Sequence, residues 1–302
     1  MTEKERLFED FTEKDFEKLD ITDDFLFYST LSRNMELCRE LLEIILDQKI
    51  QKVKLVQSQK SIKHSYDGKG VRLDVYVDDG KQTVYDIEMQ ATDNRNLPKR
   101  SRYYQGMIDL NLIKKGEDYK ALRKSYIIFV CTFDPFGKNL YRYEFENRCV
   151  DAPEIRLEDE STKIFLNPYG KGQNISKELK DFLEYLVTRD CSSDFTKRLN
   201  DEVWAVIENE EWRLEYMTLK MRDRENLERG LAAGRKEGLV AGRKEGVTAG
   251  RAESIIDLLG VVGEVPEELR EKIYEEKNVD RLRDWLRLAR SSKNVEEFQE
   301  NM

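Results

Sequence analysis

Three polar side chains interrupt two apolar segments whose alternation is typical of β-strands. Asp74 lies in the run VRLDVYV at 71–77, and Glu88 and Gln90 end the run QTVYDIEMQ at 82–90. Carboxylates that face each other across a strand pair can hold one hard divalent cation. The residue types therefore predict a metal site of the kind that suits phosphodiester hydrolysis.

The length of the loop between these strands decides whether Asp74 and Glu88 lie on the same face. A two-residue loop at Asp79-Gly80 would pair Asp74 with Tyr85 and place Glu88 on the other face. A three-residue loop would pair Asp74 with Asp86 and make Glu88 a diagonal neighbour, about 7–8 Å away. The metal site therefore requires an odd-length loop or a bulge, and Gln90 shares the face of Glu88 by the period of two.

Composition favours a core of moderate size with long solvated helices. The 302 residues are 39% hydrophobic and 37% charged, with a formal net charge of −9. Positions 49–124 carry 17 Lys and Arg against 10 Asp and Glu, a local net of +7 around the Asp74/Glu88 pair. A positive surface beside an acidic metal site suits a polyanionic substrate.

The single histidine and the spacing of the four cysteines argue against several other kinds of catalytic or metal site. The chain has one His and four Cys, with no C-x-x-C pair, so structural zinc and Ser-His-Asp or Cys-His catalysis are poorly supported. The N-terminus has no signal peptide, and no long apolar run follows. These features predict a cytoplasmic protein with no membrane association.

The periodicity predicts an α/β core followed by an all-helical tail. A helix at 22–46 precedes the hairpin, and a helix at 97–115 follows it. The most apolar strand, YIIFVCT at 126–132, is expected at the centre of the sheet, with further strands at 140–149 and 163–166. The helices of the tail are expected at 175–188, 193–228, 266–276 and 279–290.

An octapeptide repeat marks the tail. GLAAGRKE, GLVAGRKE and GVTAGRAE follow one another from Gly230 to Glu253, so glycine recurs at every fourth position. Such glycines would form a slowly winding stripe on a helix, and each costs about 1 kcal/mol relative to alanine unless a close helix partner offsets it. Both a flexible charged linker and a helix that mediates self-association fit the pattern.

Several segments together resemble the PD-(D/E)XK nuclease superfamily, in its recombination-promoting nuclease or putative transposase branch. Asp74 is followed, fourteen residues later, by Glu-x-Gln on a strand and then by a basic helix. The similar segments are ITDDFLF at 21–27, RLDVYV at 72–77, DIEMQ at 86–90, LPKRSRYYQ at 97–105, KKGEDYKALRKSYIIFV at 114–130, EWRLEYMTLKMRDRE at 211–225 and the glycine-repeat tail.

The resemblance implies a restriction-endonuclease-like α/β fold, with a mixed central β-sheet of about four strands flanked by helices. It implies DNA as the partner and Mg²⁺ or Mn²⁺ as the cofactor of a DNA endonuclease. Carried over by position, Asp74, Glu88 and Gln90 would be catalytic, with Asp74 and Glu88 as metal ligands and Asp24 on the first helix as a weaker candidate. Gln90 stands where the superfamily's general pattern has lysine, so it would orient water without supplying charge.

The basic helix supplies the expected DNA contacts, namely Lys99, Arg100 and Tyr104, of which Arg100 and Tyr104 share one helix face.

The domains expected are a nuclease core at 1–190, a helical extension at 191–228, the repeat at 229–253 and a small helical module at 254–302. Homo-oligomerisation through the C-terminal helices would present two sites to two strands. The alternative function is an inactive nuclease-fold module that binds DNA or protein.

Overall fold

The computed structural model describes residues 13–55, 61–62 and 71–302, and these fall into two compact units, residues 1–220 and 221–302. The first unit contains the sheet and the second is helical. No helix in the described part of the chain combines the length and the apolar composition that crossing a membrane requires.

A mixed six-stranded sheet in the order β1-β4-β5-β6-β8-β7 forms the centre of the first unit, in place of the about four strands that the resemblance implied. Its strands are β1 (Lys54–Leu55), β4 (Val75–Asp78), β5 (Thr83–Gln90), β6 (Lys124–Cys131), β7 (Arg142–Phe145) and β8 (Ser161–Leu166). Strands β5, β6 and β8 run parallel, and the other neighbours are antiparallel. The apolar segment at 126–132 lies inside the sheet, as predicted. A separate antiparallel pair joins β2 (Ser61–Ile62) and β3 (Val71–Arg72).

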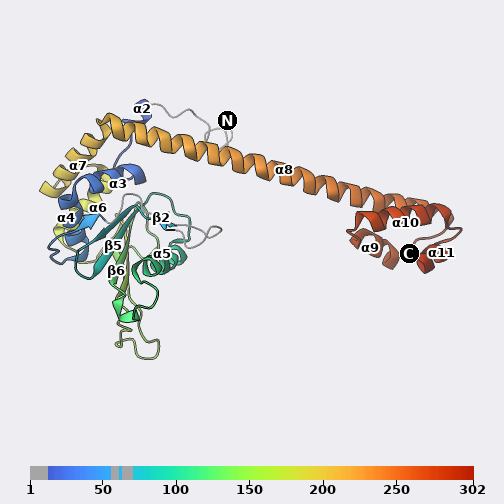
Figure 1. Ribbon diagram of the computed structural model, residues 1–302, viewed down its shortest axis with the longest axis horizontal. Helices are drawn as coiled ribbons and strands as arrows, with labels where there is room; N and C mark the ends of the chain where they lie inside the picture. The colour runs from blue at the N-terminus through green and yellow to red at the C-terminus, as the bar shows by residue number, and fades with distance from the viewer. Residues whose placement is uncertain (1–12, 56–60, 63–70) are drawn as a thin grey trace. The chain divides into compact units, whose positions relative to one another are not determined.

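Helices cover the two faces of the sheet unequally (Figure 1). One face packs against α3 (Asp24–Arg33), α4 (Met35–Leu46), α6 (Lys177–Thr188) and α7 (Asp194–Ile207), and the other packs against α5 (Leu97–Leu112). The period of two separates the two cores along β5, because Tyr85, Ile87 and Met89 pack in the larger core while Val84 packs in the smaller one. The side chains at even positions of β5 therefore face α5.

Asn34 divides the helix predicted at 22–46 into α3 and α4. Its backbone leaves the helical region, with φ −124° and ψ 89°, and its side chain accepts a hydrogen bond from the backbone N–H of Leu37. Asparagine favours this N-cap role because its side-chain oxygen replaces a missing helical acceptor. Asn209 acts in the same way at the start of α8, where it accepts hydrogen bonds from Glu211 and Trp212. The helix predicted at 193–228 is therefore two helices.

The turn between β4 and β5 is built around Asp79 and Gly80. The Asp79 carboxylate accepts hydrogen bonds from the backbone N–H groups of Lys81, Gln82 and Thr83, and Gly80 adopts φ +71°, a conformation that glycine favours. Asp78 pairs with Val84, so five residues separate the paired positions. The odd length required by the site hypothesis is present, although the register differs from both loops considered in the sequence analysis.

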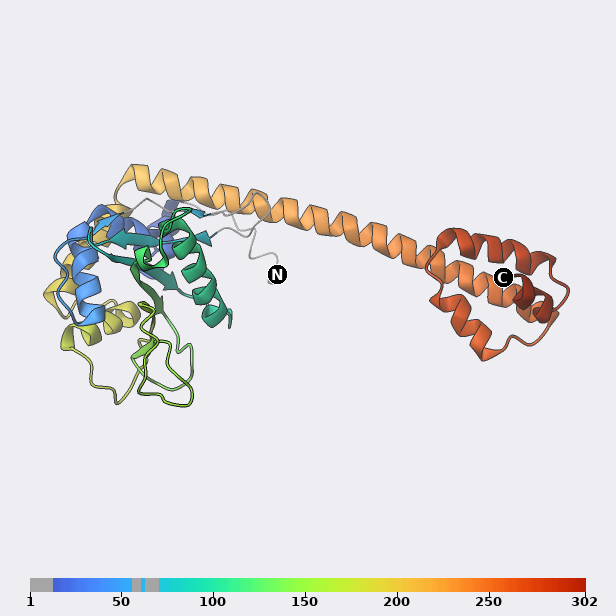
Figure 2. The same cartoon turned by 60° about the horizontal axis from the view of Figure 1, so that its bottom comes forward.

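The helix α8 (Glu210–Val262) contains the whole octapeptide repeat, so the linker interpretation is wrong. In the second unit, the end of α8 packs with α9 (Glu267–Glu275), α10 (Val279–Ser291) and α11 (Val295–Asn301) around a buried apolar core (Figure 2). Leu282, Trp285 and Ala289 of α10 contribute to this core, as their spacing predicted.

Alanine at the repeat glycines should stabilise α8 of an isolated chain. A Cβ atom at Gly234, Gly238 or Gly242 would meet nothing within 4 Å, and none of these glycines adopts a positive φ. Each substitution should contribute about 0.5–1 kcal/mol because alanine loses less backbone entropy in a helix. Far-UV circular dichroism during heating of the triple variant would measure this gain.

The matched control is Gly80→Ala, which should destabilise the first unit because of the positive φ at Gly80. A loss of helicity in the triple variant would contradict the expectation and would indicate that these glycines pack closely against another helix.

Candidate metal and nucleic-acid site

Asp74, Glu88 and Gln90 lie together at one edge of the sheet. Glu88 and Gln90 are at the carboxyl end of β5, and Asp74 immediately precedes β4, which runs antiparallel to β5. Val75 pairs with Ile87, so the same register places Asp74 directly opposite Glu88. The carboxyl ends of the parallel strands β5 and β6 share this edge, and open α/β sheets commonly bind ligands there.

The two acidic residues are joined through the backbone as well. The Asp74 N–H donates to Glu88 Oε1 at 2.9 Å, and the Met89 N–H donates to Asp74 Oδ2 at 3.2 Å. These bonds cross the strand pair in both directions, so the chain itself fixes both carboxylates beside each other. The predicted juxtaposition of Asp74 and Glu88 is therefore present.

Arg100 reaches across from α5 and contacts both Glu88 and Gln90. Its Nη2 lies 2.7 Å from Glu88 Oε2, and its Nη1 donates to Gln90 Oε1 at 2.5 Å. The guanidinium also lies over the rings of Tyr104 and Phe129, with its central carbon 5.0 and 5.4 Å from their centroids. Arg100 is therefore the counter-charge of Glu88, a partner that sequence reasoning did not assign to it.

Both polar atoms of the Gln90 side chain are engaged within the chain. Oε1 accepts from Arg100, and Nε2 donates to the Thr92 carbonyl at 2.8 Å. Because the arginine is only a donor and the carbonyl only an acceptor, these partners fix the orientation of the amide. In this arrangement Gln90 holds Arg100, and the expectation that Gln90 orients the attacking water stays a prediction.

The predicted DNA contacts differ in exposure. Lys99 is exposed in the first turn of α5, whereas Tyr104 is only 8% exposed. The Tyr104 hydroxyl accepts a hydrogen bond from Arg100 Nε at 2.9 Å. A direct contact between Tyr104 and DNA does not fit this burial; Tyr104 positions Arg100 instead.

Asp24 remains a prediction as a metal ligand. It is exposed at the start of α3, where its carboxylate accepts a hydrogen bond from the Phe25 N–H, and its negative charge helps to raise the pKa of Asp74. Within the described ranges, no three or more His, Cys, Asp or Glu side chains are grouped as a metal site. The paired acids Asp74 and Glu88 therefore carry the site.

Asp86 is the residue that sequence reasoning missed. It is fully buried on the same face of β5 as Glu88 and Gln90, and its carboxyl group lies beside that of Glu88, with which it shares a hydrogen bond when it is protonated. Asp86, Glu88 and Gln90 occupy alternate positions of one strand, so the period of two was the signal that could have found it.

The three clustered carboxyls have raised pKa values. Burial is the largest cause for each, and the charges of neighbouring acids add to it for Asp74 and Asp86, while Arg100 opposes the rise for Glu88. The Asp74 N–H and the Arg100 guanidinium both donate to Glu88, and the hydrogen bond between the two carboxyl groups raises the pKa of Asp86 and lowers that of Glu88. We therefore assign the negative charge of the cluster to Glu88 and a proton to Asp86.

The available donors fit Mg²⁺ or Mn²⁺. The atoms of Asp74, Glu88 and Gln90 that could bind a metal are oxygens, because an amide nitrogen is not a metal ligand. Mg²⁺ commonly binds one or two carboxylates, and water and phosphate complete its coordination. A divalent cation would also relieve the repulsion that raises the pKa values of these acids. Both the chemistry and the number of the ligands therefore suit such an ion.

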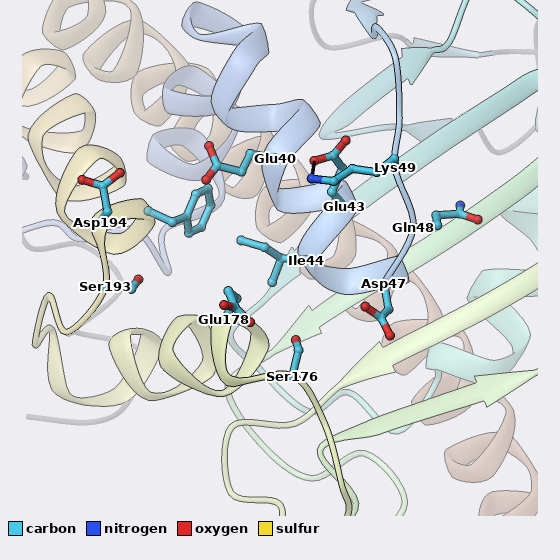
Figure 3. A pocket seen from close by; sticks show the side chains of 11 residues that line it. Glu40, Glu43, Ile44, Asp47, Gln48, Lys49, Ser176, Glu178, Ser193 and Asp194 are labelled. Carbon is cyan, nitrogen blue, oxygen red and sulfur yellow. Dashed lines mark hydrogen bonds and ion pairs between the residues drawn. The ribbon is translucent and has the colours of Figure 1, made fainter.

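A cavity of about 630 Å³ lies elsewhere, between α4, α6 and α7 (Figure 3). Acidic side chains from all three helices line it, including Glu40, Glu43, Glu178 and Asp194. This lining does not suit a polyanion, and the cavity contains none of the predicted site residues.

The sheet, its flanking helices and the paired acids define a nuclease-like α/β protein of the restriction-endonuclease type. Residues 22–231 match the family described as PD-(D/E)XK nuclease family transposase, and because this match covers more than half of the chain, the chain belongs to that family. No curated protein and no solved structure matches it.

Asp86→Asn should stabilise the metal-free protein increasingly as pH rises. A carboxyl whose pKa is raised by folding binds its proton more tightly in the native state, so its contribution declines from about pH 4 upward. Asparagine does not ionise, so it removes this pH-dependent loss of stability while it keeps the size and shape of the Asp86 side chain. Thermal unfolding from pH 4 to 8 in the presence of a chelator would measure the widening difference in melting temperature.

Asp93→Asn, at an exposed position after β5, provides the control and should follow wild type. Parallel curves for Asp86→Asn and wild type would contradict the assignment of the proton to Asp86.

Proposed function

We propose that this protein is a metal-dependent DNA endonuclease that hydrolyses phosphodiester bonds at the Asp74/Glu88 edge of the sheet. The observation that carries the proposal is the direct apposition of these carboxylates at the carboxyl end of β5. Asp74 and Glu88 would hold Mg²⁺ or Mn²⁺, and the bound ion would polarise the scissile phosphate and activate water.

The start of α5 supports a polyanionic substrate. The N-cap residue Asn96 makes no side-chain cap, and Pro98 has no backbone N–H, so the first helical N–H groups have no capping side chain. The positive end of the helix dipole adds to the charges of exposed Arg95 and Lys99. These groups lie on the same segment that brings Arg100 to Glu88, so they suit phosphates next to the paired acids.

Plasmid cleavage tests the proposed reaction. Wild type should cut DNA with Mg²⁺ or Mn²⁺ and not with EDTA. Asp74→Asn and Glu88→Gln should each lower the rate on the order of 10²-fold or more, because each removes a charged metal ligand. A 10²-fold lower rate corresponds to a loss of about 2.7 kcal/mol of transition-state stabilisation.

Asp93→Asn should keep wild-type activity, since Asp93 is exposed and contacts none of the three site residues. Cleavage that survives both site substitutions would sink the assignment of the site. Wild type that binds DNA without cutting it would favour the alternative, an inactive nuclease-fold module.

Lys99→Gln should weaken DNA binding about equally for all sequences. A phosphate contact by lysine should contribute about 0.9 to the slope of log affinity against log salt concentration, so this slope should become shallower by that amount. Fluorescence anisotropy with a labelled duplex in Ca²⁺ would measure it. Lys180→Gln, exposed on α6 across the sheet, is the control, and an unchanged slope for Lys99→Gln would contradict the contact.

We also propose self-association through the C-terminal helices. The apolar side chains of Leu231, Leu239 and Val247 on α8 are exposed, and this exposure supports a partner helix that covers them. Deletion of residues 229–302 should reduce the solution mass to that of a monomer, as measured by sedimentation. A mass that shows the same number of copies before and after deletion would contradict this role.

A further inference from the structure

The Arg100 guanidinium lies where a cation would be needed to neutralise Glu88. All three of its nitrogens are used: Nη2 for Glu88, Nη1 for Gln90 and Nε for the Tyr104 hydroxyl. The stacking of the guanidinium near Tyr104 and Phe129 adds to this fixation. Arg100 is thus held by a preformed set of contacts rather than by a loose surface pairing.

Burial explains why Glu88 requires such a partner. Its side chain is 0% exposed, and an uncompensated buried carboxylate is costly enough that it normally pairs with a charge or takes up a proton. The Arg100 guanidinium, whose Nη2 lies 2.7 Å from Glu88 Oε2, is that partner. In the protein without metal, Arg100 therefore supplies the positive charge that a divalent ion would otherwise bring to Glu88.

A divalent ion at Glu88 would compete with this arrangement. Glu88 Oε1 accepts the Asp74 N–H, and Oε2 accepts Arg100. An arriving ion would therefore meet a carboxylate that already has a cation on one oxygen. Because arginine does not lose its proton in proteins, movement of the guanidinium away from Glu88 would relieve the repulsion between the two cations.

The Arg100 side chain can move toward solvent. Its side chain is 28% exposed, while Glu88 is sealed from solvent. It belongs to the first turns of α5, next to exposed Lys99 and the uncapped helix N-terminus. A phosphate bound there would offer the released guanidinium a new anionic partner with matching bidentate geometry.

We propose that Arg100 is an internal counter-cation that exchanges with the divalent metal at Glu88, so that metal binding frees its guanidinium for a substrate phosphate. This inference rests on the proposed metal-dependent function. It assigns to Arg100 the positive charge that Gln90 does not supply, and it makes the metal and the arginine competitors for one carboxylate. By linkage, removal of the arginine strengthens metal binding and weakens the metal-free fold.

Manganese binding without DNA tests the exchange. Arg100→Gln should bind Mn²⁺ about tenfold more tightly than wild type, which corresponds to about 1.4 kcal/mol, as measured by isothermal titration calorimetry. Its melting temperature in EDTA should be lower than that of wild type, and its gain in melting temperature on adding Mn²⁺ should be larger.

Two further variants make the result specific. Arg102→Gln, exposed on the same helix, should match wild type in Mn²⁺ affinity and in metal-free melting temperature. Arg100→Lys keeps a positive charge but loses the fork, so its Mn²⁺ affinity should lie between those of wild type and Arg100→Gln. This variant keeps the test valid if Arg100→Gln does not fold without metal.

The outcomes separate this inference from the proposed function. Mn²⁺ binding by Arg100→Gln and Arg100→Lys that is equal to or weaker than that of wild type overturns the exchange, while DNA cleavage by wild type would still uphold the nuclease. Absence of Mn²⁺ binding in wild type and in both variants overturns the exchange and the metal dependence together. Mn²⁺ affinity that increases from wild type to Arg100→Lys and further to Arg100→Gln supports the exchange.

Discussion

The buried ion pair between Glu88 and Arg100 is the contact on which the rest of the site depends. A carboxylate sealed from solvent at the end of a central strand is stable only with a partner, and the fork of Arg100 supplies it. Because the Arg100 guanidinium also donates hydrogen bonds to Gln90 and Tyr104, this one side chain of α5 fixes the polar side chains at the end of β5. The packing of α5 against this face of the sheet is therefore a condition for the geometry of the site.

The second constraint is the register of β4 against β5. The turn stabilised by Asp79 and Gly80 gives an odd separation, and only an odd separation brings Asp74 to the face of Glu88. A slip of one residue would turn Asp74 toward the larger core and away from the Glu88 carboxylate. Local turn chemistry thus controls the chemistry at the other end of the hairpin, several residues away.

Much of this arrangement could be predicted from the sequence, because it follows from short-range periodicity. The strands around Asp74 and Glu88, the helix that begins at Leu97 and the central position of the segment at 126–132 are of this kind. The partners of Arg100 could not be predicted, since helix periodicity gives the face of a residue but not the strand residue that it meets. The break at Asn34 depends on a choice between helix and cap that propensity alone does not decide. Asp86 was predictable, yet its burial follows only once α5 is known to cover that face.

The central proposal is that Asp74 and Glu88 hold one divalent ion. Anomalous diffraction from crystals of the wild-type protein soaked in Mn²⁺ tests this claim most directly. We expect one anomalous peak between the carboxylates of Asp74 and Glu88, at about 2.1 Å from an oxygen of each, with the Arg100 guanidinium displaced from Glu88. A structure with Mn²⁺ bound elsewhere, or with the Arg100–Glu88 pair intact and no peak beside it at saturating Mn²⁺, would contradict it.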